Sequence, residues 1–186
     1  LPIIAGLYGV TAAGEFSMAQ RVVSIPLALV GGSVADVFHS RIANLQRSEP
    51  RKIAGSFVNM ALMLFLVGVI PTFILGFFGG QLFSIILGSE WQIAGVLVSV
   101  MCPWMLAQFI VSPISRLVLL SHQQYNKLIF DGLALSLVFF VPNWAHQARM
   151  PLEQTLQWLS LALMSAYFIY FGILYRLALQ LSRGEA

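Results

Sequence analysis

The segment Phe16–Phe38, FSMAQRVVSIPLALVGGSVADVF, contains a charged residue inside a stretch that is long and apolar enough to cross a bilayer. Crossing needs about 20 predominantly apolar residues, yet this stretch includes Arg21, Pro26 and the pair Gly31 and Gly32. A charge within a span costs roughly 2.5–3.5 kcal/mol on insertion scales, so it usually faces a water-filled cavity or a protein partner. We therefore expect this helix to do more than anchor the chain.

The composition places the chain among integral membrane proteins. Hydrophobic residues make up 59% of the 186 residues and charged residues only 9%, whereas a soluble domain has about 25% charged residues. The net charge of +3 does not indicate nucleic-acid binding, because the basic residues lie between apolar segments. The single cysteine, Cys102, supports neither an intrachain disulfide nor a cysteine-based metal site.

The apolar runs predict an all-α, polytopic helix bundle. Five full spans are expected at about 16–38, 53–78, 93–120, 126–143 and 155–179. These runs do not alternate with period two, and only helices and closed barrels satisfy their backbone in lipid. Residues 1–10 are too short to cross and lack the features of a signal peptide, so we interpret them as the end of a preceding span. We expect residues 1–186 to be one transmembrane domain belonging to a larger protein.

The charges of the connections orient the predicted bundle. If the spans alternate, eight basic residues fall on one side, whereas the other side has only Arg149 together with three glutamates. The positive-inside rule makes the basic side, and with it the C-terminus, cytoplasmic. The eight residues are Arg41, Arg47, Arg51, Lys52, Arg116, Lys127, Arg176 and Arg183.

Residues 78–91, FGGQLFSIILGSEW, lie on the opposite side and have an apolar middle that is too short to cross. Two interpretations are open. The segment could be a short amphipathic helix in the membrane interface, with Trp91 at headgroup level, or an ordinary loop bounded by glycines.

The first span has a small, polar face. Residues at three- and four-residue spacing share one side of a helix, and here they include the candidate substrate-path residues Ser17, Gln20, Arg21 and Ser24. Arg21 lies about five residues, or roughly 7–8 Å, below the expected outer end. It could line a cavity, or its side chain could reach back to the outer interface.

The third span repeats this pattern. The residues Gln108, Ser112, Ser115 and Arg116 fall on one face, beside Pro103 and Pro113. We include Gln108 and Ser112 in the candidate substrate path. Such a face could line a cavity or pack on a neighbouring helix. A proline cannot donate its backbone hydrogen bond, so a helix bends where one occurs. At the candidate hinges this bend could change during function, or it could be a static kink. These hinges are Pro26, Gly31, Gly32, Pro103 and Pro113.

Two carboxylates lie near the inner ends of spans, Asp36 in the first and Asp131 in the fourth. Each could pair with a basic residue or carry a proton, so both are candidates for ion coupling. The histidines lack metal-ligand spacing, and neither a phosphate-binding GxxxxGK[ST] loop nor a Ser-His-Asp set is recognisable in the sequence. We therefore expect no catalytic residues, no metal site, no cofactor and no enzymatic activity.

Three stretches together carry a family resemblance. The run GVTAAGEFSMAQRVVSIPLALVGGSVADVF at 9–38 resembles the opening of the C-terminal half of bacterial polysaccharide flippases, which belong to the multidrug/oligosaccharidyl-lipid/polysaccharide exporter superfamily. The runs LFSIILGSEW at 82–91 and PWMLAQFIVSPIS at 103–115 are similar to the same group.

The resemblance implies a MATE-like, two-lobed transporter of twelve helices, of which this chain would supply the end of the seventh and the eighth to twelfth. Such proteins flip an undecaprenyl-pyrophosphate-linked oligosaccharide across the bacterial inner membrane by alternating access, for O-antigen, capsule or exopolysaccharide export. Basic cavity residues are thought to contact the pyrophosphate, and Arg21 falls where one is expected. The implied partners are the lipid-linked substrate, membrane lipids, and the polysaccharide polymerase and chain-length proteins.

Two alternatives remain open from the sequence. A multidrug or cation antiporter of the same superfamily would need an acidic cavity, whereas the deepest charge here is Arg21. A non-transporting scaffold of a polysaccharide assembly complex would tolerate replacement of the polar-face residues.

Overall fold

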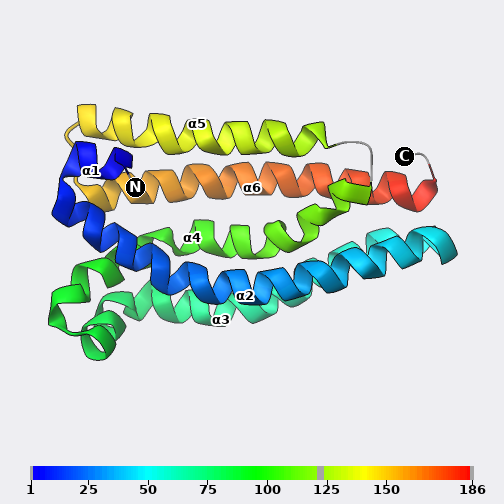
Figure 1. Cartoon of the computed structure of the whole chain (residues 1–186), viewed down its shortest axis with the longest axis horizontal. Coiled ribbons are helices and arrows are strands. Elements are labelled where there is room, and N and C mark those ends of the chain that lie inside the picture. Colours follow the sequence, from blue (N-terminus) through cyan, green and yellow to red (C-terminus); the bar gives the residue numbers. More distant parts are fainter. Residues whose placement is uncertain (1, 121–123, 185–186) are drawn as a thin grey trace.

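The chain folds into a bundle of long helices lying side by side (Figure 1). The computed structural model describes residues 2–120 and 124–184, apart from the side chain at position 26. Within these ranges there is no strand, and five helices are long and apolar enough to cross a membrane. The prediction of an all-α bundle with five spans is therefore confirmed.

The five predicted spans fall within the five long helical stretches, which extend beyond them. The third predicted span covers an α-helix together with the 3-10 helix that continues it. The α-helices are α1 (Pro2–Tyr8), α2 (Val10–Ser48), α3 (Ile53–Leu87), α4 (Gln92–Ile114), α5 (Tyr125–Gln147) and α6 (Leu152–Arg183). The 3-10 helices are η1 (Pro50–Lys52), η2 (Ser89–Trp91) and η3 (Ser115–Leu120).

The outward faces of α3 and α5 are apolar. Large side chains such as Phe65, Ile70 and Phe73 on α3, and Leu135 and Phe140 on α5, are exposed on the bundle surface. A soluble bundle would place charged residues there, so these faces suit contact with lipid.

The segment 78–91 forms neither the interfacial helix nor the loop that the sequence left open. Helix α3 runs unbroken to Leu87, and only residues 89–91 form a separate 3-10 turn. Gly79 and Gly80 lie inside the helix and face α4, since a β-carbon at either position would meet an α4 atom within 3.2 Å. Gly88 then stops it by adopting a φ of 107°, a conformation that L side chains rarely take.

Residues 1–10 contain a separate short helix, α1. Gly9 has a φ of 89° and separates α1 from α2. The Tyr8 ring meets His146 edge-on with 5.4 Å between centroids, and its hydroxyl lies 2.6 Å from Thr155 Oγ1. Helix α1 is therefore fixed against the ends of α5 and α6.

Helix α4 lies at the centre of the bundle and contacts α2, α3 and α6. Its buried side chains contribute to two apolar clusters. One cluster joins Met101 to Phe16 and Leu163, and the other joins Ile114 to Phe38. Because both clusters include residues of α2, α4 and α6, these three helices are held together along much of their length.

Helices α3 and α4 approach each other through glycine. A β-carbon at Gly79 would lie only 2.6 Å from the carbonyl oxygen of Gly95, and one at Gly95 would lie 2.8 Å from Gly80 Cα. One turn further along, the Ser99 hydroxyl donates a 2.8 Å hydrogen bond to the Leu75 carbonyl of α3. Small residues and hydroxyl bonds of this kind drive helix association in lipid.

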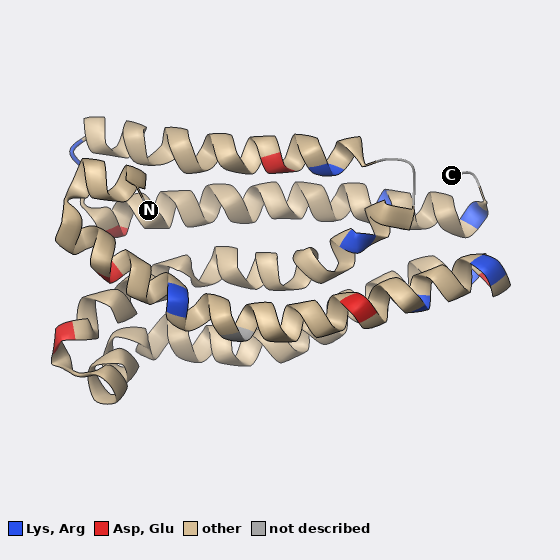
Figure 2. Ribbon diagram, viewed as in Figure 1, with Lys and Arg blue, Asp and Glu red and all other residues tan. Residues whose placement is uncertain are grey.

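Most basic residues gather at one end of the bundle, as Figure 2 shows. This end, called the basic end below, is where α2 ends, α3 and α5 begin and α6 ends. The eight basic residues that the sequence placed on one side belong to these segments, to η1 and to η3. The charge asymmetry is thus a feature of the fold, while its orientation in a membrane stays a prediction.

We predict that Gly95→Ala destabilises the protein, because its new methyl group would overlap the α3 backbone and overpacking costs about 1–3 kcal/mol. The matched control is Gly76→Ala on α3, where a β-carbon meets nothing within 4 Å. Thermal unfolding in detergent should show a lower Tm for Gly95→Ala only. Equal melting of the two variants would contradict the close approach of α3 and α4.

Candidate functional site

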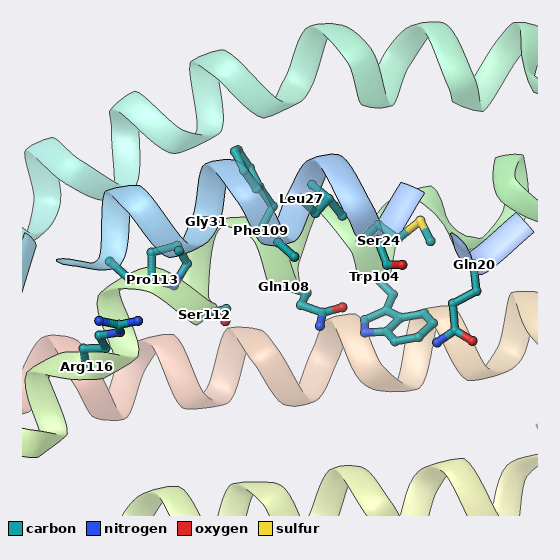
Figure 3. A pocket seen from close by; sticks show the side chains of 14 residues that line it. Gln20, Ser24, Leu27, Gly31, Trp104, Gln108, Phe109, Ser112, Pro113 and Arg116 are labelled. Carbon is teal, nitrogen blue, oxygen red and sulfur yellow. The ribbon is translucent and has the colours of Figure 1, made fainter. Parts of the chain in front are cut away.

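A polar groove of about 360 Å³ runs between α2 and the α4–η3 stretch (Figure 3). Its walls carry amides, hydroxyls, one guanidinium and several residues with little or no side chain. Helix α2 contributes Gln20, Ser24, Leu27, Ala28, Gly31, Gly32 and Ala35, and the facing stretch contributes Trp104, Met105, Gln108, Phe109, Ser112, Pro113 and Arg116. We call this feature the polar groove.

The structure brings together residues that the sequence placed on two separate spans. Gln20 and Ser24 of α2 line the same groove as Gln108 and Ser112 of α4. Three of the candidate hinges, Gly31, Gly32 and Pro113, line it as well.

Other candidate residues lie elsewhere. Ser17 is half-buried and does not line the groove, Arg21 is exposed beside it, and Pro103 lines an apolar groove between α3, α4 and α6. Position 26 lies within α2, but the Pro26 side chain is outside the described part of the chain. Helix α2 is continuous through positions 26, 31 and 32, so bending at these hinges stays a prediction.

The groove follows from helical spacing and residue size. Gln108, Ser112 and Arg116 are four residues apart, so they form a row along one side of the α4–η3 stretch, as Figure 3 shows. Opposite them, Gly32 has no atom within 4 Å of where a β-carbon would be, and for Gly31 the nearest is Pro113 Cγ at 3.8 Å. The missing side chains leave the groove open.

Two prolines shape the α4 side of the groove. Pro103 has no N–H to donate, and the next backbone amide, that of Trp104, donates to Ser160 Oγ of α6 at 3.2 Å. This bond ties α4 to α6 at the level of the groove. Two residues after Pro113, the α-helix changes to the 3-10 helix η3, which carries Arg116.

Arg21 lies deeper than the apolar run suggested. Helix α2 begins at Val10, so Arg21 is about 16 Å along it at 1.5 Å per residue. Its neighbour Gln20 shares the groove with Trp104, which is about 18 Å into α4. Arg21 and Trp104 therefore lie two or more helical turns inside their helices and not at the helix ends. Among the described residues Arg21 has no ion-pair partner.

Both candidate ion-coupling carboxylates have basic partners. Asp36 of α2 pairs with Arg116 of η3, and Asp131 pairs with Lys127 one turn away on α5 at 2.8 Å. These contacts match the ion-pair alternative, and proton carriage by either residue stays a prediction. Among the described residues there is no group of three or more His, Cys, Asp or Glu side chains that could hold a metal ion.

Sequence reasoning left Trp104 and Arg116 out of the candidate path. The signal for Arg116 was present, because it continues the four-residue spacing of Gln108 and Ser112. Trp104 has the same spacing, but an aromatic residue in an apolar run is typical of helix packing. Its position in the groove depends on the crossing of α2 and α4.

The opposite side of α2 is apolar. A cleft of about 280 Å³ lies there, lined by side chains that include Val22 and Val30 of α2 and Val67 of α3. It shares Leu27, Met105 and Phe109 with the polar groove, and α2 therefore has a polar groove on one side and an apolar cleft on the other.

Comparison with known proteins gives one family. The family described as polysaccharide biosynthesis protein matches residues 2–95, which is half of the chain. This match covers α1, α2, α3 and the start of α4, and so includes the α2 wall of the polar groove. No curated protein and no solved structure matches the chain.

We predict that the two sides of α2 differ in their access to water. With Cys102, which is buried, replaced by alanine, Ser24→Cys should react with a water-soluble maleimide at least about tenfold faster than Val30→Cys, because a thiol in lipid stays protonated. Both positions are exposed on the bundle surface. Labelling rates in native membranes test this, and equal rates would show that the groove is not hydrated.

Proposed function

Because the chain belongs to the family of polysaccharide biosynthesis proteins, we propose that it moves a lipid-linked oligosaccharide across the membrane. In this proposal the chain acts as the C-terminal, MATE-like lobe of a transporter, and the polar groove forms part of the path of the sugar head group. The observation that carries the proposal is a groove lined by amides, hydroxyls and a guanidinium, with Arg21 exposed beside it, in a bundle whose other faces suit lipid.

Energetics support a cavity at this face. A guanidinium or an amide that faces hydrocarbon loses its hydrogen bonds to water, which is costly. Arg21 and Gln20 are exposed on α2 and lie well inside the helix. Water or a second protein surface at this face would let both side chains keep their hydrogen bonds. A facing lobe that encloses a water-filled cavity provides both water and such a surface.

The groove chemistry suits the two parts of such a head group. Amides and hydroxyls, as in Gln20, Gln108 and Ser112, can both donate and accept hydrogen bonds and so match sugar hydroxyls. A guanidinium can bind phosphate oxygens through two parallel N–H bonds. Arg116 in the groove and Arg21 beside it supply such groups for an undecaprenyl-pyrophosphate-linked substrate.

The proposal requires no covalent chemistry and no cofactor. A pyrophosphate is anionic and cannot cross hydrocarbon alone. A membrane potential that is negative inside favours its outward movement by about 2.3 kcal/mol per charge per 100 mV. A cavity that opens alternately to the two sides would use this energy, without hydrolysing ATP.

We place the protein in the bacterial inner membrane with the basic end in the cytoplasm, as the positive-inside rule favours. The C-terminus then lies in the cytoplasm, where the lipid-linked substrate is made. Polysaccharide polymerase and chain-length proteins would receive the flipped product on the other side. The polysaccharide could be O-antigen, capsule or exopolysaccharide.

The cation antiporter is less well supported than the flippase. The residues that line the polar groove include no carboxylate, and the one next to it, Asp36, is paired with Arg116. A static scaffold would not need an open, hydrated groove, and it would tolerate substitutions there. Both alternatives therefore make predictions opposite to those below.

We predict that Arg21→Ala abolishes most polysaccharide export while the protein remains at normal abundance, because the exposed side chain contributes to the path and not to the core. The measurement is surface polysaccharide in cells that lack their own flippase and carry the complete gene or its variant. Export at the wild-type level from Arg21→Ala would remove this residue from the mechanism.

We also predict that Gly32→Trp blocks export by filling the polar groove. Its β-carbon would meet no atom within 4 Å, and Gly32 lines a groove of about 360 Å³, so we expect the indole to enter the groove without unfolding the bundle. The matched control is Val37→Trp on the same helix, where the side chain is 64% exposed and does not line the groove. If Gly32→Trp exports as well as Val37→Trp, the groove is not in the path.

A further inference from the structure

The ion pair between Asp36 and Arg116 joins two elements that are far apart in the sequence. Asp36 lies on α2, directly after Ala35 of the groove wall, and Arg116 lies on η3 and itself lines the groove. Figure 3 shows Arg116 at one end of the row of groove residues, with Gln20 at the other end. The pair therefore lies at the end of the polar groove nearest to the basic end of the bundle.

We propose that the Asp36 carboxylate competes with an anionic phosphate group for Arg116. This competition lowers the affinity of the polar groove for the phosphate group and so allows that group to leave. This inference rests on the proposed function, and it adds a residue that sets how tightly the head group is held. Asp36 is a positioning residue in this account, because it acts on the ligand through Arg116.

The chemistry of the two groups favours competition. A guanidinium offers five N–H donors, and a carboxylate and a phosphate present oxygen acceptors of the same kind to them. While Arg116 donates to the Asp36 carboxylate, fewer of its N–H donors are free for a ligand. The carboxylate also offsets the positive charge that a ligand would meet. A phosphate in the groove must displace Asp36 or share Arg116 with it.

The exposure of the pair allows this exchange. The Asp36 side chain is 72% exposed and that of Arg116 is 38% exposed. Exposed ion pairs are weak, because water and dissolved ions compete for both partners. A doubly charged phosphate group can therefore replace a single carboxylate here.

The ion pair is not what holds α2 to η3. Close to Asp36, the buried side chains of Phe38 and Ile42 belong to the same apolar cluster as Ile114 and Leu117. These contacts remain when Asp36 is replaced by asparagine, which has nearly the same shape. Asp36→Asn should therefore fold normally and remove only the competing charge.

A transport site gains from such a competitor. Transport requires that a ligand bind well enough to enter a site and weakly enough to leave it. A groove with an unopposed arginine would retain a pyrophosphate, whereas one with Asp36 beside Arg116 has a replacement partner ready as the ligand departs. Arg21 has no such partner among the described residues, so the two arginines differ in this respect.

The test is a binding measurement on the purified, complete protein in detergent, with inorganic diphosphate as the probe and titration calorimetry as the readout. We expect Asp36→Asn to bind diphosphate about tenfold more tightly, since it removes the negative charge next to Arg116 and leaves a weaker, neutral acceptor. The matched control is Glu49→Gln. It also removes one negative charge that is paired with a basic residue, here Lys52, but it lies away from the groove. Its Kd should stay within about twofold of the unmodified protein.

A double-mutant cycle assigns the effect to Arg116. Arg116→Gln should weaken binding, and adding Asp36→Asn to it should then give no further gain. A Kd for Asp36→Asn equal to or weaker than that of the unmodified protein would overturn the inference alone, as would a gain that persists without Arg116. If neither the unmodified protein nor Asp36→Asn shows saturable binding, the phosphate-binding role of the groove fails as well.

Discussion

Hydrocarbon offers no hydrogen bonds to a polar group, and this constraint governs how the bundle is built. Most of its outer surface is apolar, and the small, polar residues of α2 and α4 are gathered into one groove. Arg21 is the clearest case, because it is exposed well inside α2 and has no ion-pair partner among the described residues. The face that carries it needs water or a second surface. From that need follows the interpretation of the chain as one wall of a cavity.

The groove depends on a rigid support behind it. Helix α4 is held to α3 by the contact between Gly79 and Gly95, and to α6 by the bond from the Trp104 amide to Ser160. Helix α2 in turn lies across α4, with the polar groove on one side and an apolar cleft on the other. A substrate with a polar head and a hydrocarbon tail would meet suitable surfaces on the two sides of this helix.

Much of this could be predicted from the sequence, because lipid imposes simple rules on it. Apolar runs gave the number of spans, and three- and four-residue spacing found the polar faces that contain Gln20, Ser24, Gln108 and Ser112. Local patterns failed where tertiary contacts decide the outcome. Helix α3 continues past Phe78 through Gly79 and Gly80, where both glycines face α4. The pairing of Asp36 with Arg116 depends on a crossing between residues 80 positions apart. The place of Trp104 in the groove has the same origin.

The central claim is that the sugar-linked head group contacts the polar groove. The most direct measurement places a photo-crosslinking amino acid at Gln108, in cells that make a radiolabelled lipid-linked oligosaccharide, and compares it with the same substitution at Phe168. Phe168 is 61% exposed on the apolar groove of α3, α4 and α6. The account predicts labelled sugar on the protein from position 108 and little or none from position 168. Equal labelling at the two positions, or labelling at neither, would contradict it.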